Sequence, residues 1–581
     1  MNKNLLLVAI LSMLVIPISG LGHVNTVNGQ AKVVFRVGST PNMGFNPLTG
    51  QNYLFYSGIL FTPLYCYNTT YGTEPWAAES STLINSTTLE IKLKDFSWTD
   101  GHPVTAEDYK FSWDLMLNYP TSQSRFLEGI TNIEVVDSKT FLVTLASPCA
   151  GHLAFLTGPC VPVPKHIWEP MGLTNESALS YDNIPPVGFG PFKYVDYSPG
   201  EYVDFLANDN FFAGRPKIDE LIFKIYADRN TMMAAYEAGE IDATDEVPTV
   251  AIARFASDTT NRLYQYTDSG YYSIYTNQYP QPKDGNPALD DLTVRKAIAM
   301  CIDKGFITSQ LVSQPQSLTP IAEFWPEYDE SVEALWPKFD TNASAALLES
   351  AGYNDTNGDG IREDPVTHQP LAFRMIFYNE ISEGGRIIDA LKGSMNQAGM
   401  DLIDIRAMGY ELWDICTAAP YNWDLMIWNW NVHDPISCWY PYTTAAIDTA
   451  WSSSGLHDPV YDGLYATLLA STTDAQYMAA QHALQAYYVA NVTEPNLYHG
   501  GATAMWKTSW TGFVLEPGCF NLYGLNVKAF LYVEPVSSNP PPASAPAVPL
   551  EVIVGAIVAA VVVIGIAAWW ALRRRKRAPT K

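Results

Sequence analysis

The chain has 581 residues, a net charge of −26 and only 16% charged residues. Because a single hydrophobic core stops growing near roughly 250–300 residues, a chain of this length is expected to form two or three domains. The 47% hydrophobic content excludes a disordered or fibrous protein. The acidic charge repels phosphate groups, so nucleic acid is excluded as an expected partner.

The N-terminal segment has the composition of a targeting signal. Residues 1–22 read MNKNLLLVAILSMLVIPISGLG, in which one Lys precedes an apolar run and small residues follow it. This order is typical of a secretory signal peptide. The apolar run has twelve residues, Leu5 to Ile16, and is too short to span a membrane. We therefore expect the chain to be exported.

The C-terminal segment has the composition of a membrane anchor. Residues 552–572 are 21 residues without a charge, and a helix of that length is about 30 Å long, the thickness of a hydrocarbon core. The basic tail 573–581 follows, and positive charge favours the cytoplasmic side. Residues 536–549 are rich in Pro and Ser, as in a semi-rigid stalk. We expect a single-pass protein of the cell membrane, with an extracellular body and a cytoplasmic C-terminus.

Export also bears on the cysteines and on glycosylation. The chain has seven Cys, so we expect disulfides and one free thiol. Pairs of Cys149 with Cys160 and of Cys416 with Cys438 would each close a short loop, whereas Cys301 lies on the buried stripe of an expected helix. Six N-x-S/T sequons are present, at Asn68, Asn85, Asn175, Asn342, Asn354 and Asn491. A stalked, anchored and glycosylated body suggests an archaeal cell surface.

Strands and helices are mixed along the body. Apolar and polar residues alternate in 88–94, 140–146 and 201–207, which predicts half-buried strands. In 292–302 the apolar residues recur every three or four positions, which predicts a helix, and 231–238 has the composition of a second helix. This mixture predicts an α/β protein.

Sequence signatures of enzymes are missing. The chain contains no H-E-x-x-H, C-x-x-C, G-x-S-x-G or P-loop motif. A pair of glycosidase carboxylates need not be close in sequence, so a hydrolase remains an alternative. No constellation of residues supports one, and we expect a protein that is not an enzyme.

Residues 354–364 (NDTNGDGIRED) have some of the features of a calcium-binding loop. Asp355, Asn357 and Asp359 occupy positions 1, 3 and 5 of an EF-hand-like pattern. The Glu expected at position 12 is absent, and Glu363 or Asp364 would have to replace it. The alternative is a polar turn, in which Asn, Asp and Gly serve the backbone conformation. A structural calcium site and a polar turn therefore both remain open.

Five segments follow one another along the body: 96–113 (FSWTDGHPVTAEDYKFSW), 187–212 (VGFGPFKYVDYSPGEYVDFLANDNFF), 234–243 (AAYEAGEIDA), 289–304 (LDDLTVRKAIAMCIDK) and 351–364 (AGYNDTNGDGIRED). In this order they resemble the family 5 extracellular solute-binding proteins, the dipeptide, oligopeptide and nickel receptors of ABC importers. The resemblance extends over about residues 33–535. It implies a receptor that binds a solute and delivers it to permease subunits in the membrane.

The resemblance implies a two-lobed periplasmic-binding-protein-like fold of class II, in which one lobe carries an inserted domain. Ligand would bind both lobes in a closed form that the importer recognises. Residues 281–291 (QPKDGNPALDD) have the Pro, Gly and Asp content of a crossing between lobes. The expected boundaries are 31–70, 188–285 and 500–535 for lobe one, 71–187 for the inserted domain and 286–499 for lobe two.

The resemblance also locates the ligand. In peptide receptors of the family, an Asp four residues before a Pro binds the α-amine of the ligand, whereas Asn431 stands four residues before Pro435 here. An amide lacks the charge that makes such a bond strong. The Trp side chains nearby either contact ligand or belong to the core, in which case strand alternation is expected to bury one of them. The expected ligand-binding residues are Trp428, Asn429, Trp430, Asn431 and Asp434.

Several ligand classes remain open. The family favours peptides, whereas Asn431 and the flat Trp faces suit an oligosaccharide. A nickel chelate would need converging His side chains, and only His433 is close in sequence. A cell-surface hydrolase or adhesion protein is a further alternative. Apart from the calcium considered above, no cofactor is expected.

Overall fold

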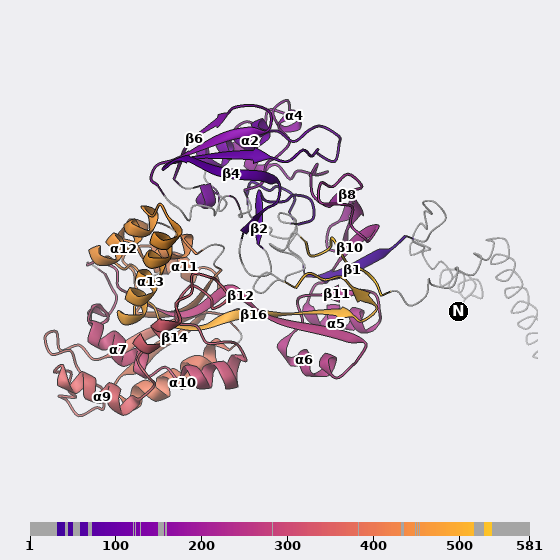
Figure 1. Cartoon of the computed structure of the whole chain (residues 1–581). Coiled ribbons are helices and arrows are strands. Elements are labelled where there is room, and N and C mark those ends of the chain that lie inside the picture. The colour runs from indigo at the N-terminus through magenta and orange to yellow at the C-terminus, as the bar shows by residue number, and fades with distance from the viewer. Residues whose placement is uncertain are drawn as a thin grey trace, which may run out of the picture. The chain divides into compact units, whose positions relative to one another are not determined.

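The computed structural model (Figure 1) describes residues 32–40, 44–49, 58–67, 73–119, 121, 124–127, 129–148, 156, 160–281, 283–381, 383–431, 435–447, 449, 451–452, 454–515 and 528–536. The expected signal peptide, transmembrane helix and basic tail lie outside these residues, as does the stalk after Val536. Among the residues described, no helix is both long enough and apolar enough to cross a membrane.

A ten-stranded mixed sheet runs through the body, in the order β14-β13-β15-β12-β16-β11-β1-β10-β9-β8. We call the half with β1 and β8–β11 lobe one, and the half with β13–β15 lobe two. The strands are β1 (Val34–Ser39), β8 (Phe192–Ser198), β9 (Tyr202–Ala207), β10 (Glu220–Ile225), β11 (Ala243–Thr244), β12 (Asn261–Thr276), β13 (Ala372–Tyr378), β14 (Asp401–Met408), β15 (Leu425–Asn431) and β16 (Asn496–Lys507).

The two longest strands connect the lobes. The first half of β12, Asn261 to Thr267, pairs with the end of β16, and its second half, Gly270 to Thr276, pairs with β15. The β12–β16 register shifts between Thr267 and Tyr271, where the strand passes from one lobe to the other. Figure 1 shows both strands running from the region of α5 and α6 to that of β14.

The crossing therefore occurs earlier than residues 281–291, where the sequence placed it. That segment already belongs to lobe two, because Asn286 N donates to Asp424 Oδ1 at 2.6 Å and Asp284 N donates to the Pro420 carbonyl at 2.8 Å. Its Pro, Gly and Asp residues form turns against the sheet, and are not a linker.

Lobe one combines a parallel and an antiparallel part. Strand β1 is parallel to β10 and to β11, whereas β10, β9 and β8 pair antiparallel. Helices α5 (Arg229–Glu237) and α6 (Thr249–Ala256) pack together through Met232, Tyr236 and Phe255. Asp228 caps α5 by accepting from the N–H groups of Asn230 and Thr231.

A separate four-stranded antiparallel sheet lies within residues 71–187, in the order β4-β5-β7-β6. Helix α2 (Ala106–Asn118) covers it and begins at a capping box formed by Thr105 and Asp108. The indole rings of Trp98, Trp113 and Trp168 are fully buried around it. The strands are β4 (Ala78–Asn85), β5 (Thr88–Leu93), β6 (Ile130–Val135) and β7 (Thr140–Leu145), and the helix α4 (Lys165–Trp168) follows.

In lobe two, helices cover both faces of the sheet. Ile274, Leu425 and Ile427 face α7, α9 and α10, while Tyr275 and Met426 face α11. A third cluster holds α12 and α13. The helices are α7 (Leu292–Met300), α8 (Lys304–Phe306), α9 (Thr341–Ser350), α10 (Gly384–Gln397), α11 (Leu412–Thr417), α12 (Pro459–Leu469) and α13 (Asp474–Ala490).

Short elements complete the described fold. Two further strand pairs join β2 to β3 and β17 to β18. These strands are β2 (Tyr65–Tyr67), β3 (Thr73–Pro75), β17 (Trp510–Thr511) and β18 (Glu534–Pro535), and the short helices are η2 (Ser124–Leu127), η3 (Glu176–Ser180), η4 (Pro287–Asp290), η5 (Ile307–Val312), η6 (Glu330–Leu335), η7 (Ser437–Tyr442) and η8 (Thr444–Ala446).

The elements expected from sequence periodicity are confirmed. The predicted strands 88–94, 140–146 and 201–207 are β5, β7 and β9, and the predicted helices 292–302 and 231–238 are α7 and α5, each within a few residues of the expected bounds. Local periodicity therefore reports these elements well, because each has one face on the core.

The cysteines only partly follow expectation. Cys301 is buried and free beside Ser344, as predicted. The predicted Cys416–Cys438 disulfide is wrong, because the Cys416 thiol is free and contacts Met426 Sδ at 3.2 Å, while Cys438 lies in a different core cluster. Cys149, the expected partner of Cys160, lies outside the described residues.

A buried histidine stands at the crossing between the lobes. His499 of β16 pairs with Tyr271 and lies 3.2 Å from the Gly270 carbonyl through Nδ1 and 3.0 Å from Ser317 Oγ through Nε2. Burial, aided by the charge of Lys304 and opposed by the hydrogen bond to the Gly270 carbonyl, lowers the pKa of His499 to about 4. The neutral imidazole is therefore the form that fits the fold.

We predict that acid weakens the fold through His499. Its pKa is lower folded than unfolded, so the unfolded chain binds more protons between pH 6.5 and about 4, and stability falls as pH falls through that window. The loss from this group reaches about 3 kcal/mol by pH 4. Denaturant unfolding of wild type and His499→Gln across this range measures it. An equally steep decline in the variant would contradict the assignment.

Candidate functional site

The connections of lobe two create a switch point in its sheet. Strands β13, β14 and β15 run parallel. The chain passes from β13 through α10 to β14 on one side, and then through α11 to β15 on the other side of β13. Open parallel sheets bind ligands outside the carboxyl ends of their strands, at such a reversal. The carboxyl end of β13 is therefore the place to look for a site.

Aromatic side chains gather at that end. Tyr378 is the last residue of β13, and its ring centroid lies 4.7 Å from that of Trp428 in β15. The Trp413 ring of α11 stacks on Trp428 at 5.3 Å and meets Trp430 edge-on at 5.1 Å. We define the aromatic cluster as Tyr378, Tyr410, Trp413, Trp428, Trp430 and Trp451.

The cluster has a buried base and an accessible rim. Trp413 and Trp428 are each only 7% exposed, and therefore form the base. Trp430 and Trp451 are half-buried and stack at 5.9 Å with an interplanar angle of 26°, whereas Tyr410 is 66% exposed. A ligand at the switch point would therefore meet Tyr410, Trp430 and Trp451.

One polar group of the cluster has no partner among the described residues. The indole Nε1–H of Trp430 is buried, and no described residue accepts a hydrogen bond from it. Buried donors are nearly always paired in native proteins, so an unpaired one needs an explanation. An acceptor atom on a ligand at the rim would provide it.

The structure places the predicted ligand-binding residues of β15 on two different faces of the strand. Trp428 and Trp430 lie on the same face of β15, because side chains two positions apart in a strand share a face. One of the two, Trp428, is buried as expected, but alternation is not the cause, because both rings share a face and both contact Trp413. Asn429 points to the opposite face. The Asn431 side chain and Asp434 lie outside what the structure describes, so their roles stay predictions.

Sequence reasoning missed Tyr378, Tyr410, Trp413 and Trp451. A usable signal existed for the first two, since Tyr378 ends a strand-like run and Tyr410 closely follows another. The rule that ligands bind at carboxyl ends would have selected them. Trp413 and Trp451 come from other segments, and only the fold brings them to the cluster.

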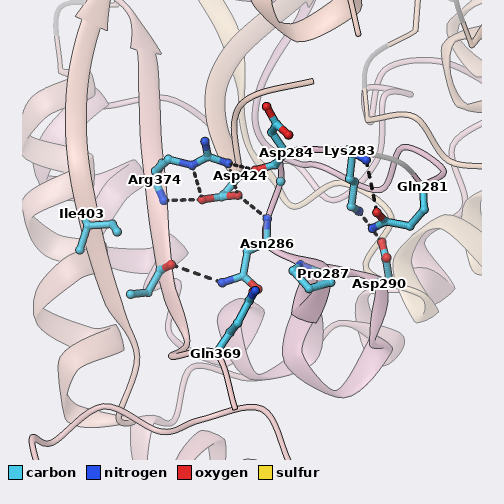
Figure 2. A pocket seen from close by; sticks show the side chains of 12 residues that line it. Gln281, Lys283, Asp284, Asn286, Pro287, Asp290, Gln369, Arg374, Ile403 and Asp424 are labelled. Carbon is cyan, nitrogen blue, oxygen red and sulfur yellow. Dashed lines mark hydrogen bonds and ion pairs between the residues drawn. The ribbon is translucent and has the colours of Figure 1, made fainter. Parts of the chain in front are cut away.

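A cavity of about 630 Å³ opens at the opposite, amino ends of the same strands. Figure 2 shows Arg374 reaching Asp424, whose carboxylate it contacts through Nε and Nη2 at 2.9 Å each. Lys283 Nζ lies 2.6 Å from Asp290 Oδ1. Both lining cations, Arg374 and Lys283, are thus already paired with carboxylates. We assign it a structural role, in which Asp424 fastens the turn at Asn286 to the sheet.

The calcium-like loop is held together by its own hydrogen bonds. Both Asp355 carboxylate oxygens accept backbone N–H groups, from Gly358 at 2.7 Å and Gly360 at 3.0 Å. Asn357 Nδ2 donates to Asp359 and to Glu363, so it presents a donor to both acids. Asp355, Asp359 and Glu363 nevertheless bring carboxylate oxygens within 4.8 Å of one another. The donor set fits calcium only in part, because one ligand amide points its nitrogen inward.

Known proteins share this architecture. The family model for bacterial extracellular solute-binding proteins, family 5, matches residues 72–449, more than half of the chain. The oligopeptide-binding protein AppA of Bacillus subtilis is 24% identical over 352 residues, 59% of this chain and 62% of AppA. The nickel-binding periplasmic protein of Escherichia coli is 24% identical over 374 residues, 62% of this chain and 68% of its own. The chain spans 62–65% of its relatives from Brucella ovis and Bacillus subtilis.

Solved structures agree with the fold. The AppA-like peptide-binding protein of Clostridium difficile superposes with a TM-score of 0.73 at 18% identity, covering 86% of this chain and 100% of that one. AppA of Bacillus subtilis, solved with a nonapeptide, gives 0.69 at 19% identity over 87% and 99%. The fold is thus the mixed α/β, two-lobed, periplasmic-binding-protein-like one that the sequence predicted. The chain belongs to the family 5 extracellular solute-binding proteins.

Proposed function

We propose that the chain is the extracellular substrate-binding component of an ABC importer, and that it captures peptides and delivers them to the permease. Family membership supports a receptor role without catalysis. Relatives named as oligopeptide-binding proteins support a peptide ligand. The observation that carries the proposal is the aromatic cluster at the switch point, with its one unpaired indole donor.

A peptide satisfies both features of the cluster. Its backbone carbonyl accepts a hydrogen bond from Trp430 Nε1–H, the donor without a partner among the described residues. Its apolar side chains contact the faces of Tyr410 and Trp451 at the rim. Ligand that also contacts lobe one favours the closed form, since binding shifts the population toward the state with more contacts.

Asn431 sets how the peptide is held. The resemblance places it where peptide receptors of the family carry the Asp that binds the α-amine. A neutral amide accepts from an ammonium group more weakly than a carboxylate does. The receptor therefore recognises peptides mainly through their backbone and side chains, and discriminates little between free and blocked N-termini.

An oligosaccharide is the second candidate ligand, favoured by one observation. Trp430 and Trp451 present nearly parallel faces at 5.9 Å, and half-buried aromatic faces are suited to the C–H face of a sugar ring. Under this hypothesis Trp430 Nε1–H donates to a sugar hydroxyl.

Anchoring completes the proposal. The apolar segment 552–572 and the basic residues after it tether the body outside the membrane, with the C-terminus in the cytoplasm. A tethered receptor stays close to its permease, which raises the effective concentration at which the two meet.

Binding measurements separate the two ligands. Trp430→Phe keeps a ring but removes the donor, and is expected to weaken peptide binding by about 0.5–1.5 kcal/mol. Tyr410→Ala removes an exposed aromatic face and is expected to cost about 1–3 kcal/mol. Tyr532→Ala, an exposed tyrosine outside the cluster, serves as the matched control and should bind as wild type does. Calorimetric titration with peptides and oligosaccharides shows which ligand loses affinity.

The same titrations test Asn431. Asn431→Asp adds a charge-assisted bond and should tighten free-amine peptides relative to N-acetylated ones. It should not change oligosaccharide binding. If all these variants bind every ligand as wild type does, the cluster is not the site.

The loop at residues 354–364 is expected to act structurally. Because its carboxylates already accept backbone N–H groups, a calcium chelator should leave ligand affinity unchanged and lower the unfolding temperature only slightly. Asp359→Asn, which removes one carboxylate of the acidic set, should abolish even that small response. A large loss of affinity in chelator would show that calcium shapes the binding site.

Membrane partitioning tests the anchor. The full chain is expected to need detergent for extraction, whereas a chain ending at Pro535 should remain in the aqueous phase. Fractionation of cells that express either form measures this. Recovery of the shortened chain with the membranes would contradict a C-terminal tether.

A further inference from the structure

A second group of ligating side chains lies outside the aromatic cluster. Asp100 and His102 follow β5, and His166 belongs to α4, beside the separate four-stranded sheet. One ligand atom from each of the three residues lies within 4.8 Å of the other two. None of these residues belongs to the ten-stranded sheet that carries the proposed ligand site.

The spacing within this group matches a metal site. His166 Nε2 lies 2.8 Å from Asp100 Oδ2, and His102 Nδ1 lies 3.3 Å from Asp100 Oδ1. Atoms that each lie about 2.1 Å from one Zn²⁺ ion are separated by roughly 3.0–3.4 Å in octahedral or tetrahedral geometry. Small side-chain rotations would therefore bring the three atoms onto a common ion.

The two loop residues are held in place by a tight turn. Trp98 N donates to the His102 carbonyl at 2.8 Å, and Gly101 N donates to the Trp98 carbonyl at 2.9 Å. Gly101 has a φ of +97°, a conformation that other residues rarely adopt, so the turn depends on glycine. His102 N also donates to Asp100 Oδ1 at 3.1 Å. The turn thus holds Asp100 and His102 side by side.

The third residue is fixed from the other side. Lys165 N donates to Asp108 Oδ1 at 2.9 Å, which ties α4 to α2, and Trp168 is fully buried. Figure 1 shows α4 next to α2. The His166 ring stacks on His102 at 4.1 Å with an interplanar angle of 30°. Ligands held this way lose little freedom when a metal binds.

A hydrogen bond between Asp100 and His166 would by itself join the two segments. That hydrogen bond does not explain why His102 lies beside the other two residues, since the side chain of His102 is 61% exposed and contributes little to the core. A bound cation explains all three side chains together.

We propose that Asp100, His102 and His166 form a binding site for a divalent transition-metal ion. Two imidazoles and one carboxylate suit Zn²⁺, Ni²⁺ or Cu²⁺, whereas Ca²⁺ and Mg²⁺ prefer oxygen ligands alone. Three protein ligands leave coordination positions for water or for a ligand from outside, since the site opens to solvent. His102 and His166 are 64 residues apart in the sequence. An ion bound to both links two segments of the folded chain and so stabilises it against unfolding.

The test uses the full chain, stripped with chelator and then titrated with Zn²⁺ or Ni²⁺ in excess Ca²⁺. Wild type is expected to bind one ion at this site and to unfold at a higher temperature. His102→Gln, at an exposed position, should keep the fold but weaken binding more than about tenfold, as the loss of a direct ligand exceeds that of an outer partner. His368→Asn is the control, because His368 is exposed, lies outside the group, and has a φ of 58° that Asn tolerates.

Spectroscopy supplies an independent measurement. Cu²⁺ bound to wild type should show electron paramagnetic resonance couplings to two nitrogen atoms, and His102→Gln should show at most one. The proposal is overturned if wild type shows no nitrogen coupling, or if His102→Gln binds Zn²⁺ and Ni²⁺ as tightly as wild type. Since peptide binding uses other residues, these outcomes do not depend on the proposed importer function.

Discussion

The pairing of β12 with β16 along both halves of β12 joins the two lobes, and the rest of the fold depends on it. Within β12, only the second half pairs with β15. Among the described strands, the first half of β12 is hydrogen-bonded to β16 alone, whereas its second half lies between β16 and β15 and is hydrogen-bonded to both. The register shift between Thr267 and Tyr271 marks where β12 passes from one lobe to the other. His499 pairs at that shift and must stay neutral there. The passage between the lobes and the buried, neutral His499 therefore lie in the same short stretch of β12 and β16.

The two ends of the lobe-two strands differ in how completely their polar groups are paired. At the amino ends, Arg374 and Asp424 satisfy each other and nearby backbone groups, so the charges hold turns in place. At the carboxyl ends, Trp430 keeps an indole donor without a partner among the described residues. An unsatisfied buried donor costs about 1–3 kcal/mol. In the proposed site, a ligand supplies the missing acceptor.

The local sequence pattern predicted individual strands and helices well, but it did not predict which strands pair with one another. Periodicity identified β5, β7, β9, α5 and α7, because each carries a core-facing stripe. It could not show that β12 pairs with β16 along both halves and with β15 along the second, so the crossing was placed at 281–291 on composition alone. The resemblance led to Trp428 and Trp430, but Trp413 and Trp451 join them only through the order of strands. Strand order is set by contacts distant in sequence, which no local pattern contains.

The metal-binding group and the aromatic cluster illustrate two ways of making a site. The cluster depends on long-range topology, since its rings come from β13, β15, α11 and the segment at Trp451. The metal-binding group needs only one tight turn at Gly101 and one helix docked by Asp108. The four-stranded sheet shares its hydrophobic core with lobe one, but His102 is exposed, so the site can gain or lose this ligand with little effect on that core. The exposed position of His102 means that its replacement alters metal affinity far more than folding, and for that reason the two sites can change independently.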